Sequence, residues 1–223
     1  MPVDLLLPMK PLARAKTRLL GAADGGLGAP GAHARLVLAL VRDTVAAAAT
    51  AAVVRRTIVI CSDAVVCRAL ATGGVETIPD EPAAGLNSAL RYGEALLRSA
   101  DPDATVATVP ADLPALRSHE LDRAIRDSLA TGGRAFCTDQ AGTGTTLLLA
   151  PPGQELAPCF GPGSAAAHRA GGAQELAGCW PGLRCDVDTA ADLVLARELG
   201  LGPFTRAALG IAQLGIPQPG IHP

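Results

Sequence analysis

The chain has 223 residues, a formal net charge of −2 and 49% hydrophobic residues, which suits one domain with a single buried core. The near-neutral charge argues against non-specific DNA binding, and an aromatic content of 2% argues against a base-stacking surface or an aromatic sugar cleft. The first apolar run, VDLLLPM, is short and acidic, and no apolar run reaches membrane-spanning length. We therefore expect a cytoplasmic protein that binds neither nucleic acid nor a membrane.

Short strand-like runs alternate with helical stretches along the chain. This alternation predicts an α/β fold with a mostly parallel central sheet, helices on both faces and an antiparallel element among the later strands. We expect one domain over residues 1–205 and a partly flexible tail over 206–223. Strands are predicted at 3–8, 56–61, 75–79, 104–110, 134–139, 145–151 and 183–187. Helices are predicted at 32–52, 64–72, 86–99, 118–130, 164–177 and 189–199.

Local signals mark two of the helix starts, and the cysteines indicate a reduced protein. Ser118 with Glu120, and Thr189 with Asp192, are typical of helix capping. The six cysteines form no C-x-x-C pair and lie within or beside apolar segments. We expect small buried thiols rather than zinc ligands or disulfides.

A basic loop, MKPLARAKTRL, follows the first predicted strand. It holds both lysines of the chain, Lys10 and Lys16, together with Arg14 and Arg18. Ligands of open α/β sheets bind beyond the carboxyl ends of the strands, so these cations are candidates for phosphate binding and catalysis. A solvated basic loop is the alternative. A P-loop is excluded because no G-x-x-x-x-G-K-[ST] motif is present.

Three aspartates follow predicted strands in the middle and last parts of the chain. Asp112 stands between two prolines, which predicts a rigid and exposed carboxylate. Asp186 and Asp188 alternate along the predicted strand 183–187 and its end, which would place them on one face, although Asp188 could also be a helix-start residue. Carboxylates from separate strand ends form a hard oxygen site, so these aspartates are candidate Mg²⁺ ligands.

Two glycine-rich stretches complete the set of candidate binding segments. GTGTT at 142–146 precedes a strand, and FGPGSAAAH at 160–168 leads into a helix with Ser164 near its first turn, where exposed amides favour an anion. Asn87 in GLNSAL could bond the base or ribose of a nucleotide, or cap its helix. The four histidines, His168 among them, show no ligand spacing and are expected on helices or at the surface.

These motifs, in this order and spacing, closely resemble one family. KPLARAKTRL, GLNSAL, ADLPAL, GTGTT, FGPGSAAAH and GLRCDVDTAADL are similar to the 2-phospho-L-lactate guanylyltransferases of coenzyme F-420 biosynthesis, called phosphoenolpyruvate guanylyltransferases in the bacterial branch. The resemblance spans roughly residues 3–203. It implies the Rossmann-like nucleotidyltransferase fold of molybdopterin guanylyltransferases, without the usual G-x-G-x-R loop.

The resemblance also implies roles for individual residues. It places the carboxylate of the acceptor substrate against Thr145, Gly161 and Ser164. It places Mg²⁺ on Asp112 and Asp186, and Lys10 against the phosphates. We expect Lys10, Lys16 and Arg18 to be catalytic, Lys10, Arg14 and Asn87 to bind the nucleotide, and Asp188 to be a further candidate metal ligand.

The implied reaction joins phosphoenolpyruvate to the GMP moiety of GTP and releases pyrophosphate, giving enolpyruvyl-2-diphospho-5'-guanosine. The attacking phosphate monoester has a second pKa near ~6 and is mostly dianionic at neutral pH, so it needs no general base. The same reaction on 2-phospho-L-lactate, another nucleotidyltransfer or sugar transfer on the same architecture, and a non-catalytic nucleotide-binding regulator are the alternatives. The oligomeric state stays open, with a homodimer among the options.

Overall fold

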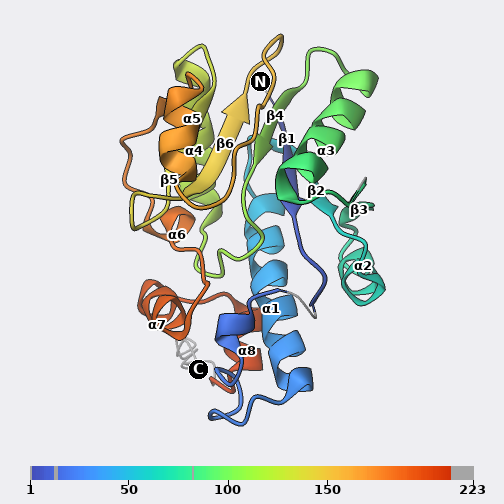
Figure 1. Cartoon of the computed structure of the whole chain (residues 1–223), viewed down its shortest axis with the longest axis vertical. Helices are drawn as coiled ribbons and strands as arrows, with labels where there is room; N and C mark the ends of the chain where they lie inside the picture. Colours follow the sequence, from blue (N-terminus) through green and yellow to red (C-terminus); the bar gives the residue numbers. More distant parts are fainter. Residues whose placement is uncertain (1, 13–14, 82, 212–223) are drawn as a thin grey trace, which may run out of the picture.

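The computed structural model describes residues 2–12, 15–81 and 83–211 and is built around one seven-stranded sheet (Figure 1). The strand order is β3-β2-β1-β4-β6-β5-β7. The strands are β1 (Val3–Pro8), β2 (Val54–Ile60), β3 (Glu76–Ile78), β4 (Thr105–Thr108), β5 (Ala135–Thr138), β6 (Thr145–Ala150) and β7 (Gln174–Glu175). The helices are η2 (Thr17–Leu19), α1 (Pro30–Ala49), α2 (Ala64–Ala71), α3 (Leu86–Ala100), α4 (Ser118–Ala130), α5 (Ser164–Ala170), α6 (Pro181–Arg184), α7 (Ala190–Leu199) and α8 (Pro203–Ala208).

The sheet is mostly parallel, as predicted. β1 pairs in parallel with β2 and β4, and β2 pairs in parallel with β3. β6 runs antiparallel to both of its neighbours, β4 and β5. The predicted antiparallel element among the later strands is therefore confirmed.

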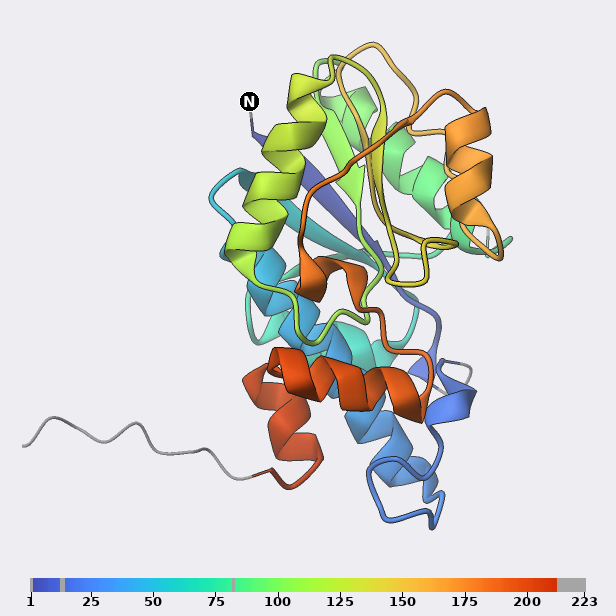
Figure 2. The same cartoon turned by 90° about the vertical axis from the view of Figure 1, so that its left-hand side faces the viewer.

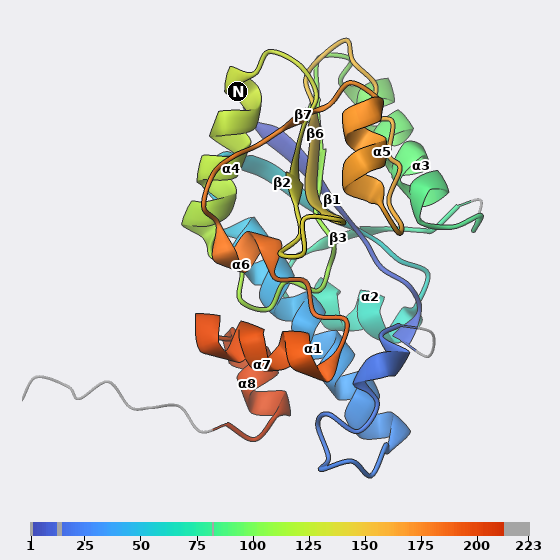
Figure 3. The same ribbon diagram turned by 60° about the vertical axis from the view of Figure 1, so that its left-hand side comes forward.

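Helices cover both faces of the sheet, which Figure 3 shows nearly edge-on. Alternate residues of a strand point to opposite faces, and β1 follows this rule. Leu5 and Leu7 belong to the core shared with α1, α2 and α4, while Leu6 belongs to the core shared with α3 and α5. All three are fully buried, and β1 lies between β2 and β4 in the sheet, so the start of its following loop is fixed.

A third, smaller core lies beyond the ends of the strands. Leu19 of η2, Leu36 of α1 and Leu193 of α7 pack together there. α8 packs on α1 (Figure 2). The buried carboxylate of Asp43 on α1 accepts hydrogen bonds from the backbone N–H groups of Phe204 and Thr205 at the start of α8. This layer of α7, α8 and η2 covers the end of the sheet where β1 terminates.

Two predicted elements are wrong. Residues 183–187 form no strand: α6 occupies 181–184, and the segment after it is irregular. The predicted helix over 164–177 stops at Ala170, because Gly171 and Gly172 follow it and Gly172 adopts a φ of 85°. The chain then returns to the sheet as the short strand β7, parallel to β5.

Other boundaries and side-chain positions differ in smaller ways. α8 continues the fold past residue 205, while 212–223 lie outside the described residues. All six cysteines are free; three are buried as expected, but Cys159 and Cys179 are exposed. Within the described part of the chain, no helix is both long and apolar enough to cross a membrane.

Candidate active site

The basic loop after β1 is anchored to the rest of the fold by its apolar residues. Leu12 and Ala15 are buried, and the Leu12 N–H donates to Asp63 Oδ2 at 3.0 Å. Asp63 also caps α2 through the N–H of Val65, and these hydrogen bonds lower the pKa of its carboxyl. The loop after β1 is thereby tied to the start of α2.

Lys16 occupies an unusual backbone position at the end of this loop. Its φ of 53° and ψ of 42° lie in the left-handed region, which non-glycine residues rarely adopt. Conformations of this kind persist where the surrounding structure imposes them, and they cluster at functional sites. Here the conformation starts η2 and directs the Lys16 side chain toward two carboxylates.

The loop that carries Asp112 is fixed by backbone hydrogen bonds on both sides. The N–H of Leu113 donates to the hydroxyl of Thr44 on α1 at 2.8 Å. The N–H of Val187 donates to the carbonyl of Asp112 at 3.0 Å, which binds the segment before α7 to this loop. The Asp112 side chain is only 15% exposed, so the predicted exposed carboxylate is wrong: it is largely buried at the wall of a cavity.

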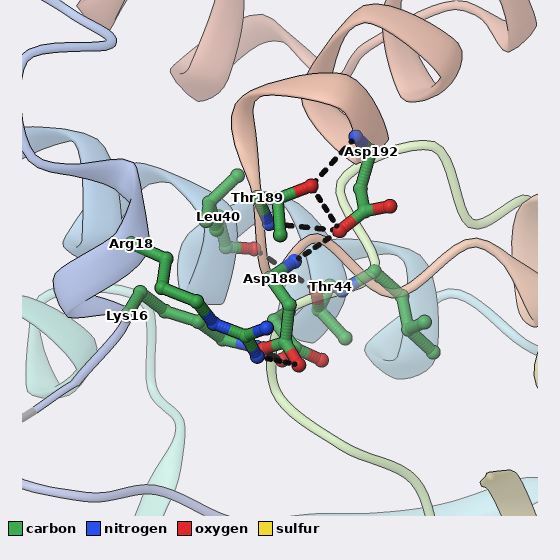
Figure 4. A network of polar contacts seen from close by, with 9 residues as sticks. Lys16, Arg18, Leu40, Thr44, Asp188, Thr189 and Asp192 are labelled. Carbon is green, nitrogen blue, oxygen red and sulfur yellow. Dashed lines mark hydrogen bonds and ion pairs between the residues drawn. The ribbon is translucent and has the colours of Figure 1, made fainter.

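Asp188 is held in place by the capping box of α7. Thr189 and Asp192 cap each other as predicted, and the Asp192 carboxylate also accepts the N–H of Asp188 at 3.1 Å (Figure 4). The N-cap of α7 is Thr189, so Asp188 is not the capping residue. Its carboxylate instead points toward Lys16 and Arg18.

Lys16 joins the two carboxylates across the site. Its ammonium group forms ion pairs with both Asp112 and Asp188, and Arg18 pairs with Asp188 at 3.0 Å. Burial alone would lower the pKa of Lys16, but the charges and hydrogen bonds of the two aspartates outweigh it and raise this pKa. Burial likewise opposes ionisation of Asp188, yet the hydrogen bond and charge of Lys16 lower its pKa, with Arg18 and Lys10 contributing. Lys16 is therefore a fixed cation.

A cavity of about 420 Å³ opens over this ion-pair network. It lies at the carboxyl ends of β1 and β4 and suits a small-molecule ligand. Three of the buried oxygens at its wall have no hydrogen-bond partner among the described residues: Asp80 Oδ1, Thr108 Oγ1 and Asp112 Oδ1. Buried polar atoms normally have partners, so these oxygens indicate a ligand site. The charged residues that line the cavity are Lys10, Lys16, Arg18, Asp80, Asp112 and Asp188.

Asp186 lies beside this cavity without lining it. Burial, reinforced by the negative charges of Asp112 and Asp188, raises the pKa of Asp186 to about 7, although Lys16 opposes the shift. Its charge is thus coupled to that of Asp112, as the predicted pairing of these two carboxylates requires.

The oxygen donors at the cavity fit one mode of Mg²⁺ binding. No cluster of three or more His, Cys, Asp or Glu side chains in the described ranges is arranged to hold a metal ion. However, the unpartnered Asp112 Oδ1 is a hard oxygen donor, and Mg²⁺ commonly takes one or two carboxylates and completes its shell with substrate phosphates and water. Asp112, with Asp186 nearby, fits that mode of binding.

The two glycine-rich stretches meet on the other side of the sheet end. The N–H of Ala165 donates to the carbonyl of Thr143 at 3.1 Å, which joins the start of α5 to the turn before β6. Thr145 and Ser164 are buried, and Gly161 is exposed. Phe160, next to Gly161, lines the cavity, so the segments predicted to bind the acceptor adjoin the cavity that holds Lys16 and Asp112.

Asn87 and Arg14 were also predicted to bind the nucleotide. Asn87 uses its side-chain amide on the backbone of Phe160, donating to the carbonyl at 3.0 Å and accepting from the N–H at 2.8 Å. The N-cap of α3 is Gly85, so Asn87 does not cap its helix. Arg14 lies outside the described residues.

His168 is the most informative residue that the sequence did not single out. It lies on α5, as expected of a helix residue, but it is 3% exposed and contacts Thr145 Oγ1 at 2.9 Å. Burial, with repulsion from Arg134, lowers its pKa to about 4. A signal was available, because His168 follows Ser164 by four residues and so lies on the same helix face.

His168 should make the stability of the fold depend on pH. Its pKa falls from 6.5 to about 4 on folding, so the neutral ring stabilises the fold above pH 6.5 and this contribution is lost as the pH drops toward 4. The full loss is on the order of 3 kcal/mol. Urea unfolding gives the free energy of unfolding of the wild type and of His168→Gln at pH 7.5 and 4.5. The wild type should exceed the variant by less at pH 4.5 than at pH 7.5. An unchanged difference would contradict the neutral buried histidine.

Comparisons with known proteins agree with this geometry. Residues 3–159 match the family described as "Guanylyl transferase CofC like". The chain belongs to this family. A phosphoenolpyruvate guanylyltransferase of Streptomyces avermitilis is 50% identical, covering 96% of both chains, and one of Geodermatophilus obscurus is 48% identical, covering 93% and 94%. A solved nucleotidyl transferase from Methanothermobacter is 19% identical with a TM-score of 0.57, covering 93% of this chain and 99% of that one, which supports the fold.

Membership of this guanylyl transferase family places the ion-pair network at the end of a nucleotidyltransferase sheet. The structure brings Lys10, Lys16 and Arg18 together with Asp112 and Asp188 at one cavity, while Asp186, which was predicted to pair with Asp112, does not line it. It adds Asp80 and Thr108, whose roles the motifs did not reveal.

Proposed function

We propose that this guanylyl transferase joins phosphoenolpyruvate to the α-phosphorus of GTP and releases pyrophosphate, as a step in coenzyme F-420 biosynthesis in the cytoplasm. The observation that carries the proposal is the cationic Lys16 between Asp112 and Asp188 in a cavity at the ends of β1 and β4. The family and the names of the relatives support the choice of substrates.

The central chemical problem is electrostatic. A phosphate oxygen of phosphoenolpyruvate attacks the α-phosphorus, the bond from this phosphorus to the bridging oxygen of the β-phosphate breaks, and pyrophosphate carries away the electron pair. The attacking oxygen is already ionised near neutral pH, so no proton has to be removed. The protein must instead hold two anions together and stabilise the charge that develops on the leaving group.

Lys16, Arg18 and Lys10 supply the positive charge for this task. Lys16 is held by two carboxylates, which fixes its position before the substrates bind. Arg18 is 68% exposed and can turn from Asp188 toward a phosphate. Lys10 is exposed at the wall of the same cavity, just after the end of β1, and would contact the triphosphate from there.

Asp112 and Asp186 would hold Mg²⁺, and Asp188 is a further candidate ligand. When bound, the ion would neutralise phosphate charge in the transition state. The free Oδ1 of Asp112 supports this assignment. The ammonium of Lys16 pairs with the other oxygen of Asp112, Oδ2, and with Oδ1 of Asp188.

The acceptor would bind with its carboxylate against Thr145, Gly161 and Ser164. The hydrogen bond from Ala165 to Thr143 keeps these segments together, and Phe160 connects them to the cavity. This placement would bring the acceptor's phosphate toward Lys16 and Asp112, as the transfer requires.

Pyrophosphate release tests the proposal directly. The purified protein is assayed with Mg²⁺ and GTP, ATP or CTP, and with phosphoenolpyruvate or 2-phospho-L-lactate in turn. We expect release with GTP and phosphoenolpyruvate to exceed every other combination. A preference for 2-phospho-L-lactate would identify that acid as the acceptor substrate. No release with any pair of substrates would favour a nucleotide-binding regulator without catalysis.

A further inference from the structure

His168 connects the segments that form the acceptor side of the site. It lies four residues after Ser164 on α5, and its two ring nitrogens contact different segments. Nδ1 is 2.9 Å from Thr145 Oγ1, and Nε2 accepts the N–H of Cys159 at 2.9 Å. One imidazole thus links α5, the start of β6 and the loop that leads to Gly161.

The partners of the ring determine its tautomer. The N–H of Cys159 can only donate, so Nε2 must be the unprotonated, accepting nitrogen. In the neutral ring the proton then lies on Nδ1, which donates to Thr145 Oγ1. Because Thr145 Oγ1 accepts this bond, its own hydroxyl proton remains available to donate to an anion.

The ring is also fixed by packing. It lies edge-on to Phe160 with the ring centroids 5.1 Å apart, and it is tilted against Phe136 at 5.9 Å. Asn87 holds the next residue of the same loop, Phe160, through both of its backbone polar groups. His168 and Asn87 therefore hold consecutive residues of the loop just before Gly161.

We propose that His168 is a positioning residue for acceptor binding, which orients the Thr145 hydroxyl as a donor to the carboxylate of the three-carbon phosphorylated acid. The inference rests on the proposed function, because Thr145 must face that acid. His168 itself contacts no substrate. Its effect should therefore appear in acceptor affinity and leave the nucleotide side of the reaction unchanged.

Two conservative substitutions separate the two hydrogen bonds of the ring. His168→Asn places an amide near the position of Nδ1 and can still donate to Thr145. His168→Gln places its amide near Nε2 and can still accept from Cys159, but it loses the bond to Thr145. We expect His168→Gln to raise the KM for phosphoenolpyruvate about tenfold or more, with the KM for GTP within about twofold, and His168→Asn to stay nearer the wild type.

A double-mutant cycle with Thr145→Val tests whether the effect passes through the hydroxyl. If it does, His168→Gln adds little to the KM for phosphoenolpyruvate once the hydroxyl is gone. Two results would overturn the proposal in favour of a purely structural role. One is an equal rise in the KM for phosphoenolpyruvate in His168→Asn and His168→Gln. The other is that His168→Gln raises this KM as much in the Thr145→Val background as in the wild type. Thermal unfolding of each variant checks that it is folded.

Nitrogen NMR of the wild-type histidines provides a test that needs no variant. At pH 7 we expect one ring with a protonated Nδ1 and an unprotonated Nε2, and the opposite tautomer would overturn the proposal. A wild-type enzyme that makes no product with any phosphorylated acid would instead refute the proposed function. The two failures are therefore distinguishable.

Discussion

Replacing Asp112 with asparagine is expected to reduce pyrophosphate release from GTP and phosphoenolpyruvate by at least ~10²-fold. The substitution keeps the side-chain volume but removes a carboxylate that pairs with Lys16 and has a free, buried oxygen. Asp186→Asn should reduce the rate similarly, because its carboxyl is coupled to that of Asp112. Initial rates at saturating substrates measure the effect.

The fold should survive the Asp112 substitution. The backbone bond from Val187 to Asp112 does not involve the carboxylate, so the melting temperature should change by only a few degrees. Asp127→Asn is a matched control, since Asp127 is exposed on α4 and does not line the cavity. Near-normal turnover in both Asp112→Asn and Asp186→Asn would remove these carboxylates, and the metal they would hold, from the mechanism.

Replacing Lys16 with methionine is expected to lower turnover by ~10²-fold or more. Methionine retains the length of the side chain, but it removes the cation that Asp112 and Asp188 fix in the cavity. Because the pKa of Lys16 is raised, the wild-type ammonium stays protonated across the usual assay range, and no step in the pH–rate profile should come from it. The KM for GTP should rise together with the fall in kcat.

The effects of the charge and of the shape of the Lys16 side chain on the rate can be measured separately. Lys16→Arg retains the charge on a larger, planar group, so it should recover only part of the lost rate. Arg126→Met, on an exposed position of α4, controls for the loss of a cation elsewhere. If Lys16→Met turned over at the wild-type rate, Lys16 would have no role in catalysis, and the basic loop would be an ordinary solvated surface.

The parts of the fold with strong periodic signals were predictable, and the errors have physical causes. The run LRCDV at 183–187 was predicted as a strand, and its Leu183, Cys185 and Val187 are all buried. Their burial comes from packing of a helical turn and an irregular segment into the core around α1, α2 and α4 and into the smaller core beyond the strand ends, and not from sheet pairing. Apolar residues at alternate positions do not distinguish a strand of the sheet from a buried helical turn followed by an irregular segment. Pro181, at the first position of α6, was a usable helix signal.

The candidate site was predictable at the level of its segments. The basic loop and the two aspartate-bearing loops follow from their places after apolar runs and from the family motifs. Which cation pairs with which carboxylate was not predictable, because it depends on the left-handed backbone of Lys16 and on the burial of Asp112. The same applies to His168, which packs against the rings of Phe136 and Phe160 and accepts the N–H of Cys159, because none of these contacts follows from its place on the helix.

The central claim is that a phosphate oxygen of phosphoenolpyruvate becomes bonded to the α-phosphorus of GTP, and the product itself tests this most directly. Phosphorus NMR of a reaction with GTP and phosphoenolpyruvate carrying ¹⁸O in its phosphate follows both the new bond and its bridging oxygen. We predict two coupled diphosphate signals for a guanosine product that retains the label in the bridge, formed one-to-one with pyrophosphate. Pyrophosphate that appears with free GMP, or a product without the acceptor's phosphorus, would contradict it.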